Sequence, residues 1–255
     1  MNLSELGGFF IEKNMIKNNA IAILGGMGPS ASVYLYDMLI KLSAKLYGAK
    51  NNDDYPEIIL HSIPIPDFIS SDEKQQEALL MLQERIRLLS QMNISCFSIA
   101  CNTAHLLLEK LQSITPIPFI SMTEVVIQEV QKKKLKRVGI LGAPSNIRAH
   151  LYQNPLNQLG IQTIIPNEIQ LKELELVIRN VIAGIYSTQD TNKLIAIAKD
   201  LEKSGAEGII LGCTELPLVF PKTYTIPVFN SVEILCKALL QNYYGSHTIG
   251  RIYDK

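Results

Sequence analysis

The sequence predicts an α/β protein made of two similar lobes, each built around a mostly parallel sheet, with an active-site cleft between them. Two observations lead to this fold class. Short apolar runs alternate with helical segments along almost the whole chain. In addition, the segment 20–26 is matched by the segment 137–143, and each is followed by Pro, Ser and a helical stretch. Two halves that open with matching segments indicate two α/β units related by a pseudo-twofold axis.

The expected strands are short, rich in Ile, Val and Leu, and show no alternation of apolar with polar residues. Such runs are typical of strands that are covered by helices on both faces. Because helical segments separate them, we expect parallel sheets built from right-handed βαβ units. The strands are predicted at residues 20–24, 57–62, 95–100, 117–120, 137–141, 161–165, 207–211 and 226–229.

Two helices are clear in the sequence. The segment 73–92 carries one apolar stripe and acidic residues in its first turn. The segment 187–204 ends before Gly205, a residue that commonly terminates helices.

The predicted organisation has three parts. Residues 1–19 form an N-terminal extension. Residues 20–120 together with 226–255 form the first lobe, because the last strand and helix are expected to return to it. Residues 121–225 form the second lobe.

Composition excludes several classes of protein. Of the 255 residues, 47% are hydrophobic, which argues against disorder. The 24 basic and 24 acidic residues balance, so no net charge favours nucleic acid or an anionic membrane as a partner. No apolar run approaches the roughly 18 residues that cross a bilayer, and the apolar stretch 6–11 is too short for a signal peptide. We therefore expect a cytoplasmic protein with reduced thiols.

Two cysteine loops carry the functional prediction. Cys101 and Cys213 each directly follow a predicted buried strand, and each precedes hydroxyl or amide side chains suited to a helix N-terminus. Ligands of such folds bind at the carboxyl ends of the strands. A helix N-terminus favours the thiolate form of a cysteine, so one thiol could act as a base and the other as an acid.

Placed on opposite faces of a planar carbanion, two thiols could remove a proton from one side and return one from the other. This reaction inverts a stereocentre and requires no cofactor, provided that the site stabilises the negative charge. Asn102, Thr103 and Thr214 are suitable donors for that purpose.

Other interpretations of the cysteines stay open at this point. Cys101 and His105 could form half of a zinc site, although no second pair has ligand spacing, so we expect no metal. Cys101 could be a covalent nucleophile with His105 as its base, or could form a disulfide with Cys213. Cys96 and Cys236 lie in a predicted strand and a predicted helix, which is typical of inert core thiols.

Two further loops lie at predicted strand ends. The segment 25–30 (Gly-Gly-Met-Gly-Pro-Ser) lacks the lysine of a P-loop, so a tight turn close to a small anion is the better interpretation. Asp67 follows Pro64 and Pro66, and either orients a group in the site or forms a turn.

Together, the motifs at 25–29, 101–105 (Cys-Asn-Thr-Ala-His) and 211–216 (Leu-Gly-Cys-Thr-Glu-Leu) resemble those of the aspartate/glutamate racemase family. The resemblance covers residues 20–245. It implies two Rossmann-like lobes, usually in a homodimer, and a pyridoxal-independent amino-acid racemase that needs no cofactor. It also implies that Cys101 and Cys213 transfer the protons. The expected substrate-binding residues are Met27, Asp67, Asn102, Thr103 and Thr214.

The chain departs from the aspartate-specific members in ways that bear on the substrate. Those members carry Arg where Phe68 stands and Lys where Ile182 stands, and Thr is usual at Ala143 and Asn146. Each change removes a cation or a hydroxyl group that could bind a dicarboxylate. Residues 61–62 and 67–68 are closer to the branch of broad-specificity or L-aspartate/glutamate racemases.

Three functions therefore remain. The first is racemisation of a free amino acid, with aspartate, glutamate or a broader set as substrate. The second is a related two-cysteine reaction on a small molecule such as a dicarboxylate, catalysed by a hydantoin racemase or a maleate isomerase. The third is a homologue that binds a small molecule without turnover.

Overall fold

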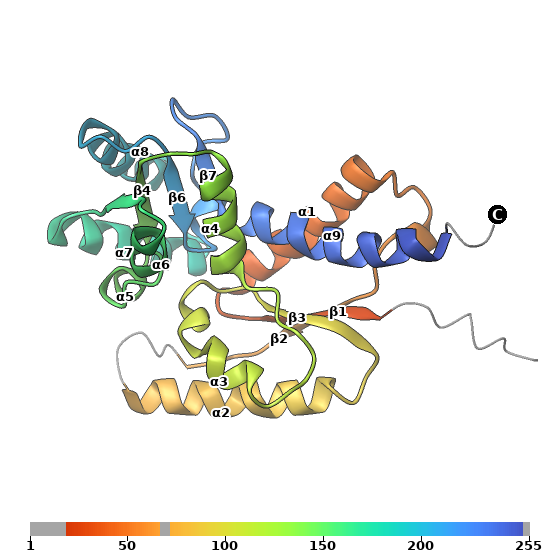
Figure 1. Cartoon of the computed structure of the whole chain (residues 1–255). Helices are drawn as coiled ribbons and strands as arrows, with labels where there is room; N and C mark the ends of the chain where they lie inside the picture. The colour runs from red at the N-terminus through yellow and green to blue at the C-terminus, as the bar shows by residue number, and fades with distance from the viewer. Residues whose placement is uncertain (1–18, 67–71, 252–255) are drawn as a thin grey trace, which may run out of the picture.

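The computed structural model describes residues 19–66 and 72–251, and there the chain forms two sheets of parallel strands (Figure 1). The first sheet, of order β2-β1-β3, contains β1 (Ala20–Gly25), β2 (Ile58–Ser62) and β3 (Ile94–Ile99). The second, of order β5-β4-β6-β7, contains β4 (Arg137–Gly142), β5 (Gln162–Ile164), β6 (Ile209–Gly212) and β7 (Val228–Asn230). The predicted α/β fold class is confirmed.

Helices cover both faces of the first sheet, as its unalternating strands predict. Alternate side chains of β1 enter two different cores: Ala22 and Leu24 pack toward α2, and Ile21 and Ile23 pack toward α1 and α9. Figure 1 shows these helices on opposite sides of the sheet. The helices of this region are α1 (Pro29–Tyr47), α2 (Asp72–Leu89), α3 (Leu108–Gln112) and α9 (Ser231–Arg251), with short 3-10 helices at η1 (Asn52–Asp54) and η3 (Thr103–Leu107).

The second sheet is also buried between helices. One core contains residues of α7 and α8, and the other contains residues of α4 and α6. Side-chain caps fix where the long helices begin, since Asn167 and Ser187 each start their helix with a capping box. The helices are α4 (Met122–Lys132), α5 (Pro144–Arg148), α6 (Gln153–Gln158), α7 (Glu168–Ile182) and α8 (Thr188–Lys203), with the 3-10 helix η4 (Leu216–Leu218).

The strand predicted at 117–120 is wrong: the segment makes only an isolated bridge between Phe119 and Phe97. Its backbone has another partner. The amide of Phe119 donates to Oε1 of Gln112 at 2.9 Å, and Nε2 of Gln112 donates to the carbonyl of Ile117 at 3.1 Å. One glutamine side chain therefore binds backbone groups of the kind that a neighbouring strand would bind.

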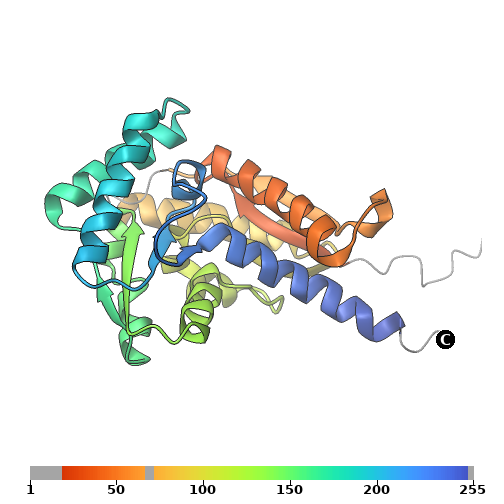
Figure 2. The same ribbon diagram turned by 90° about the horizontal axis from the view of Figure 1, so that it is seen from above.

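The strand predicted at 226–229 exists as β7, but its assignment to the first lobe is wrong. β7 pairs with β6 and completes the second sheet, as expected for strands that follow one another along the chain. The chain crosses to the first lobe only after β7, where α9 packs between α1 and α4 (Figure 2). Except for Asn19, the predicted N-terminal extension lies outside the described residues.

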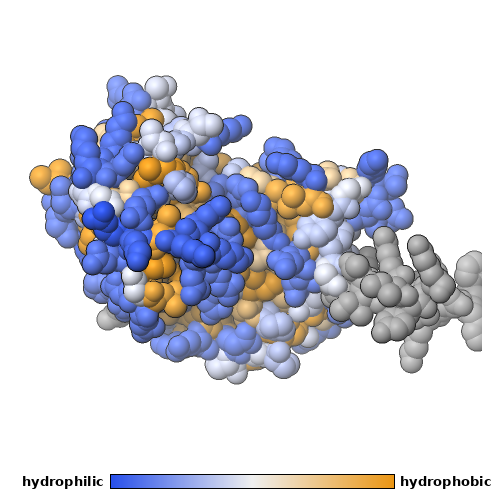
Figure 3. Space-filling view, turned by 45° about the horizontal axis from the view of Figure 1, so that its top comes forward, coloured by the Kyte–Doolittle hydropathy of each residue, from blue (hydrophilic) through white to orange (hydrophobic). Residues whose placement is uncertain are grey.

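None of the described helices is both long enough and apolar enough to span a bilayer. On the face seen in Figure 3, apolar patches are small and are separated by hydrophilic residues.

Candidate active site

A cavity of about 260 Å³ lies where the loops after β1, β2 and β3 meet helix α7 of the second lobe. Three predicted site residues of the first half line its wall: Cys101, Thr103 and, from the glycine loop, Met27. Since the loops come from the carboxyl ends of parallel strands, this is the position in which α/β folds bind ligands.

The glycine loop brings its backbone unusually close to neighbouring segments. Gly26 and Gly28 have φ angles of 92° and 68°, in the left-handed region. Ser32 of α1 closes the turn, because its Oγ accepts from the amide of Gly26 at 2.9 Å and donates to the carbonyl of Gly28 at 3.1 Å. A Cβ atom on Gly26 would overlap the backbone of Ile63. The loop is therefore the predicted tight turn.

Cys101 is partly exposed on the cavity wall. Burial, followed by the negative charge of Glu215, raises the pKa of its thiol to about 12. Backbone N–H groups of Thr103 and Ala104 act in the opposite direction, as expected at a helix start, but they do not overcome burial. Burial therefore opposes the thiolate form at Cys101, which precedes only a short 3-10 helix.

Cys213 belongs to the second lobe and is only 7% exposed. Its Sγ donates a hydrogen bond to Oε2 of Glu215 at 2.9 Å. Burial raises the pKa of this thiol well above its usual value, and the charges of Glu215 and Cys101 raise it further. The thiolate form is not favoured here either, because the nearest helix, η4, has three residues and starts beyond Glu215.

Glu215 is a candidate site residue that the sequence analysis did not select. Its carboxyl group is buried, and burial raises its pKa. Oε2 accepts from Cys213 and, at 3.0 Å, from Oγ1 of Thr214, whereas Oε1 has no hydrogen-bond partner among the described residues. Oε1 lies against Gly28 of the other lobe. A carboxyl group inside an otherwise apolar loop was the available signal, because such groups are rarely buried without a function.

Asn102 and Thr214, both predicted to bind substrate, have protein partners. Nδ2 of Asn102 donates to Oγ of Ser231 at 3.3 Å, and its Oδ1 accepts from the hydroxyl of Tyr152 in the second lobe at 2.5 Å. The Thr214 hydroxyl is occupied by Glu215. The bond between Asn102 and Tyr152 joins the two lobes, whereas the bond of Thr214 stays within one loop. A direct contact with substrate would require one of these bonds to open.

His105 cannot serve as the base for Cys101 in this arrangement. Its Nε2 accepts from the amide of Met122 at 2.9 Å, so Nδ1 carries the proton and donates to the carbonyl of Cys101 at 2.8 Å. Burial lowers the pKa of the ring to about 4, which keeps it neutral. The interpretation of Cys101 as a nucleophile activated by His105 is therefore wrong.

The other residues that the sequence analysis named lie in different parts of the chain. Asp67 and Phe68 lie outside the described residues. Ala143 is buried in the core, and Nδ2 of Asn146 donates to the carbonyl of Gly212, directly before Cys213, at 3.0 Å.

The other two cysteines are core residues. Cys96 and Cys236 share the core between the first sheet and α9, as predicted. All four cysteines are free thiols. Across residues 19–66 and 72–251, no three His, Cys, Asp or Glu side chains form a group that could hold a metal ion.

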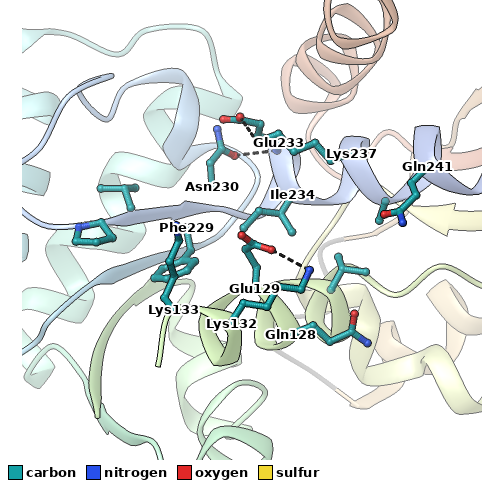
Figure 4. A pocket seen from close by; sticks show the side chains of 14 residues that line it. Gln128, Glu129, Lys132, Lys133, Phe229, Asn230, Glu233, Ile234, Lys237 and Gln241 are labelled. Atoms are coloured by element: carbon teal, nitrogen blue, oxygen red, sulfur yellow. Dashed lines mark hydrogen bonds and ion pairs between the residues drawn. The ribbon is translucent and has the colours of Figure 1, made fainter. Parts of the chain in front are cut away.

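A larger cavity, of about 450 Å³, lies between α4, β7 and α9 (Figure 4). Its acidic residues are paired within their own helices, Glu129 with Lys132 at 3.2 Å and Glu233 with Lys237 at 2.7 Å. It contains no cysteine, so the smaller cavity is the candidate active site.

Comparisons with known proteins identify the family of the chain. The Asp/Glu/hydantoin racemase family model matches residues 24–239. The broad-specificity amino-acid racemase RacX of Bacillus subtilis is 28% identical, over 88% of this chain and 97% of its own.

Two solved structures have the same fold. An aspartate racemase homologue from Pyrococcus horikoshii is 28% identical, with a TM-score of 0.75, over 89% of this chain and 99% of its own. The Picrophilus torridus aspartate racemase is 25% identical, with a TM-score of 0.78, over 89% and 95%. The chain belongs to the Asp/Glu/hydantoin racemase family.

Proposed function

We propose that this chain is a cofactor-independent amino-acid racemase, in which Cys101 and Cys213 transfer protons at the Cα atom of the substrate. One observation carries the proposal. Cys101 and Gly28 line the same cavity, and Glu215, the hydrogen-bond partner of Cys213 in the other lobe, places its Oε1 against Gly28. The names of the relatives support amino-acid racemisation. The cytoplasmic location and the homodimer expected from the sequence belong to the same proposal.

Both thiols are protonated at rest, so the reaction needs a group that accepts a proton from one of them. Glu215 is this acceptor. Its Oε2 already accepts the hydrogen bond from Cys213, and burial makes the carboxylate a stronger base than usual. The Cys213 proton moves to Oε2, which leaves a thiolate beside a neutral acid. The thiolate then removes the α-proton from one face of the substrate, and Cys101 donates its own proton to the other face.

The reverse direction uses the same groups in the opposite order. When Cys101 acts as the base, the N–H groups of Thr103 and Ala104 stabilise its thiolate. Because the Glu215 carboxyl group lies between Gly28 and Cys213, it must shift as the substrate enters. Its unpartnered Oε1 then has a hydrogen-bond partner in the substrate's α-ammonium group. Asn102, Thr103 and Thr214 are proposed to bind the α-carboxylate.

Isotope exchange tests this mechanism. Each enantiomer of aspartate and glutamate is incubated with the enzyme in D₂O, and loss of the α-proton signal is followed by NMR. We expect Cys101→Ser and Cys213→Ser each to abolish racemisation, and Cys96→Ala, a core variant, to retain it. If either serine variant racemised at the wild-type rate, the two-thiol assignment would be wrong.

One observation favours a second candidate, a homologue that binds without turnover: both thiols rest protonated, and Cys213 is nearly inaccessible. Ligand-dependent thermal stabilisation with no isotope exchange for any substrate would support it. The same panel, extended to hydantoins and maleate, tests the other two-cysteine reactions.

A further inference from the structure

Most of the described side chains that line the active-site cavity are apolar. They come from both lobes: from the loops after β1 and β2, and from the last turn of α7. The apolar lining residues are Met27, Pro29, Ile65, Pro66 and Ile182. Met27 and Ile65 also pack on the core of the first lobe, so this part of the wall has a fixed shape.

Ile182 is the apolar residue that the second lobe contributes to the wall. It is the last residue of α7, and its side chain is 46% exposed. Its Cγ1 lies 3.7 Å from the position that a Cβ atom on Gly28 would take, so it faces the glycine loop across the cavity. A ligand that covers the exposed part of this side chain removes apolar surface from water, which favours binding.

The cation on the cavity wall is already paired. Among the described lining residues, Arg179 alone carries a formal charge, and its Nε and Nη2 donate to Oε1 of Glu175 at 3.0 and 2.7 Å. Both side chains are about half exposed, so water screens the field that the pair leaves. The pair therefore adds little attraction for an anionic ligand.

The buried charge beside the cavity is negative. The Glu215 carboxyl group is buried and lies against Gly28, a lining residue. In the proposed mechanism Glu215 and Cys213 together carry one negative charge, and a proton transfer between them leaves this total unchanged. The α-ammonium group of a substrate offsets that charge, whereas a carboxylate on the side chain would be repelled by it.

Resting on the proposed function, we infer that the preferred substrates are amino acids with an uncharged, apolar side chain of about the length of methionine, and that Ile182 is a specificity-determining residue. Methylene groups gain from packing on the apolar wall, and a charged end would lose water there without gaining a partner. The cavity volume of about 260 Å³ lies below the roughly 300–1,000 Å³ of sites for drug-sized ligands, as suits a single amino acid.

The test compares kcat/KM for L-methionine, L-glutamine and L-glutamate, whose side chains are of similar length and differ in the end group. Exchange of the α-proton in D₂O is the readout. We expect wild type to prefer methionine to glutamate by about tenfold, the lower end of the discrimination by apolar pockets, with glutamine between them. Ile182→Lys should lower the methionine-to-glutamate ratio by about tenfold, because the new cation pairs with the carboxylate of glutamate.

Two further variants serve as controls. Ile182→Leu keeps an apolar side chain and should keep the order of the three substrates. Ile185→Lys adds the same cation three residues further along the chain, where the side chain is 70% exposed and lies outside the cavity, so the wild-type ratio should remain.

The outcomes separate this inference from the proposed function. If wild type exchanges these amino acids without preferring methionine, the inference is refuted and the racemase proposal stands. If Ile182→Lys changes the ratio no more than Ile185→Lys does, the role of Ile182 is refuted. If wild type exchanges no amino acid, the proposed function fails, and calorimetric binding of L-methionine and L-glutamate decides. Tighter binding of methionine that Ile182→Lys reverses supports the inference, and equal or undetectable binding of both refutes it.

Discussion

Glu215 Oε1 lies so close to Gly28 that a Cβ atom at residue 28 would overlap it. The carboxyl group comes from the loop after β6, and the glycine from the loop after β1, so the contact joins the two lobes across the cavity. A second feature favours glycine at this position: its φ angle of 68° lies in the left-handed region. The fit between these two residues sets where the proton acceptor of Cys213 stands.

Gly28→Ala should therefore abolish α-proton exchange, because its methyl group would push the Glu215 carboxyl group away from Cys213. Gly48→Ala is a matched control: Gly48 has a similar φ angle, 73°, but nothing within 4 Å of a new Cβ. Gly48→Ala, in the left-handed helical region with a ψ angle of 20°, should lose about 1 kcal/mol of unfolding free energy from backbone strain, measured in urea. Gly28→Ala should lose more, because its ψ angle of 121° lies outside that region. Wild-type exchange by Gly28→Ala would contradict the proposed position of Glu215.

Glu215→Gln keeps the shape of the side chain but removes the proton acceptor. We expect exchange to fall by at least about 100-fold, the contribution typical of a general base. Wild-type exchange should also weaken on acidification, with a midpoint above pH 4.5 because burial raises the pKa of Glu215, and the variant should lack this limb. Glu129→Gln, at an exposed ion pair, should behave as wild type. An active Glu215→Gln enzyme with an unchanged pH profile would exclude Glu215 as the base.

The sequence was sufficient to place Cys101 and Cys213 at strand ends, because buried strands and the loops that follow them are encoded locally. It could not predict the state of the thiols, which depends on burial by the other lobe and on the charge of Glu215. A helix N-terminus favours a thiolate only where its dipole exceeds the cost of desolvation. Here the elements after both cysteines are short 3-10 helices.

Two errors in the predicted fold have the same physical origin. In each case a partner that the local sequence does not indicate determines the structure of the segment. The segment 117–120 has the composition of a strand, but the Gln112 side chain binds its backbone groups. The segment 226–229 has no local feature that assigns it to one of the two sheets. It joins the second sheet because it pairs with the edge of β6.

His105 should make the fold sensitive to acid. Its folded-state pKa, about 4, lies below the usual value of 6.5, so the unfolded chain binds an extra proton between these values. The stability from His105 is therefore present above about pH 6.5 and is lost as pH falls toward 4, by about 3 kcal/mol at 1.4 kcal/mol for each pH unit.

Urea unfolding of wild type and His105→Gln from pH 4 to pH 7 checks this effect, and the variant should show a smaller slope of unfolding free energy against pH. His150 is exposed, so His150→Gln should keep the wild-type slope. A wild-type slope in His105→Gln would show that other groups cause the acid sensitivity.

Tyr152→Phe should weaken the bond between the lobes without changing the shape of the core. The variant leaves Oδ1 of Asn102 buried without its donor, which costs about 1–3 kcal/mol of unfolding free energy. If Asn102 helps to bind the α-carboxylate, the looser side chain should also raise KM more than it lowers kcat. Tyr186→Phe, at a half-exposed ring, is the control for loss of a hydroxyl group. Should Tyr152→Phe match that control in stability and in KM, this bond contributes to neither.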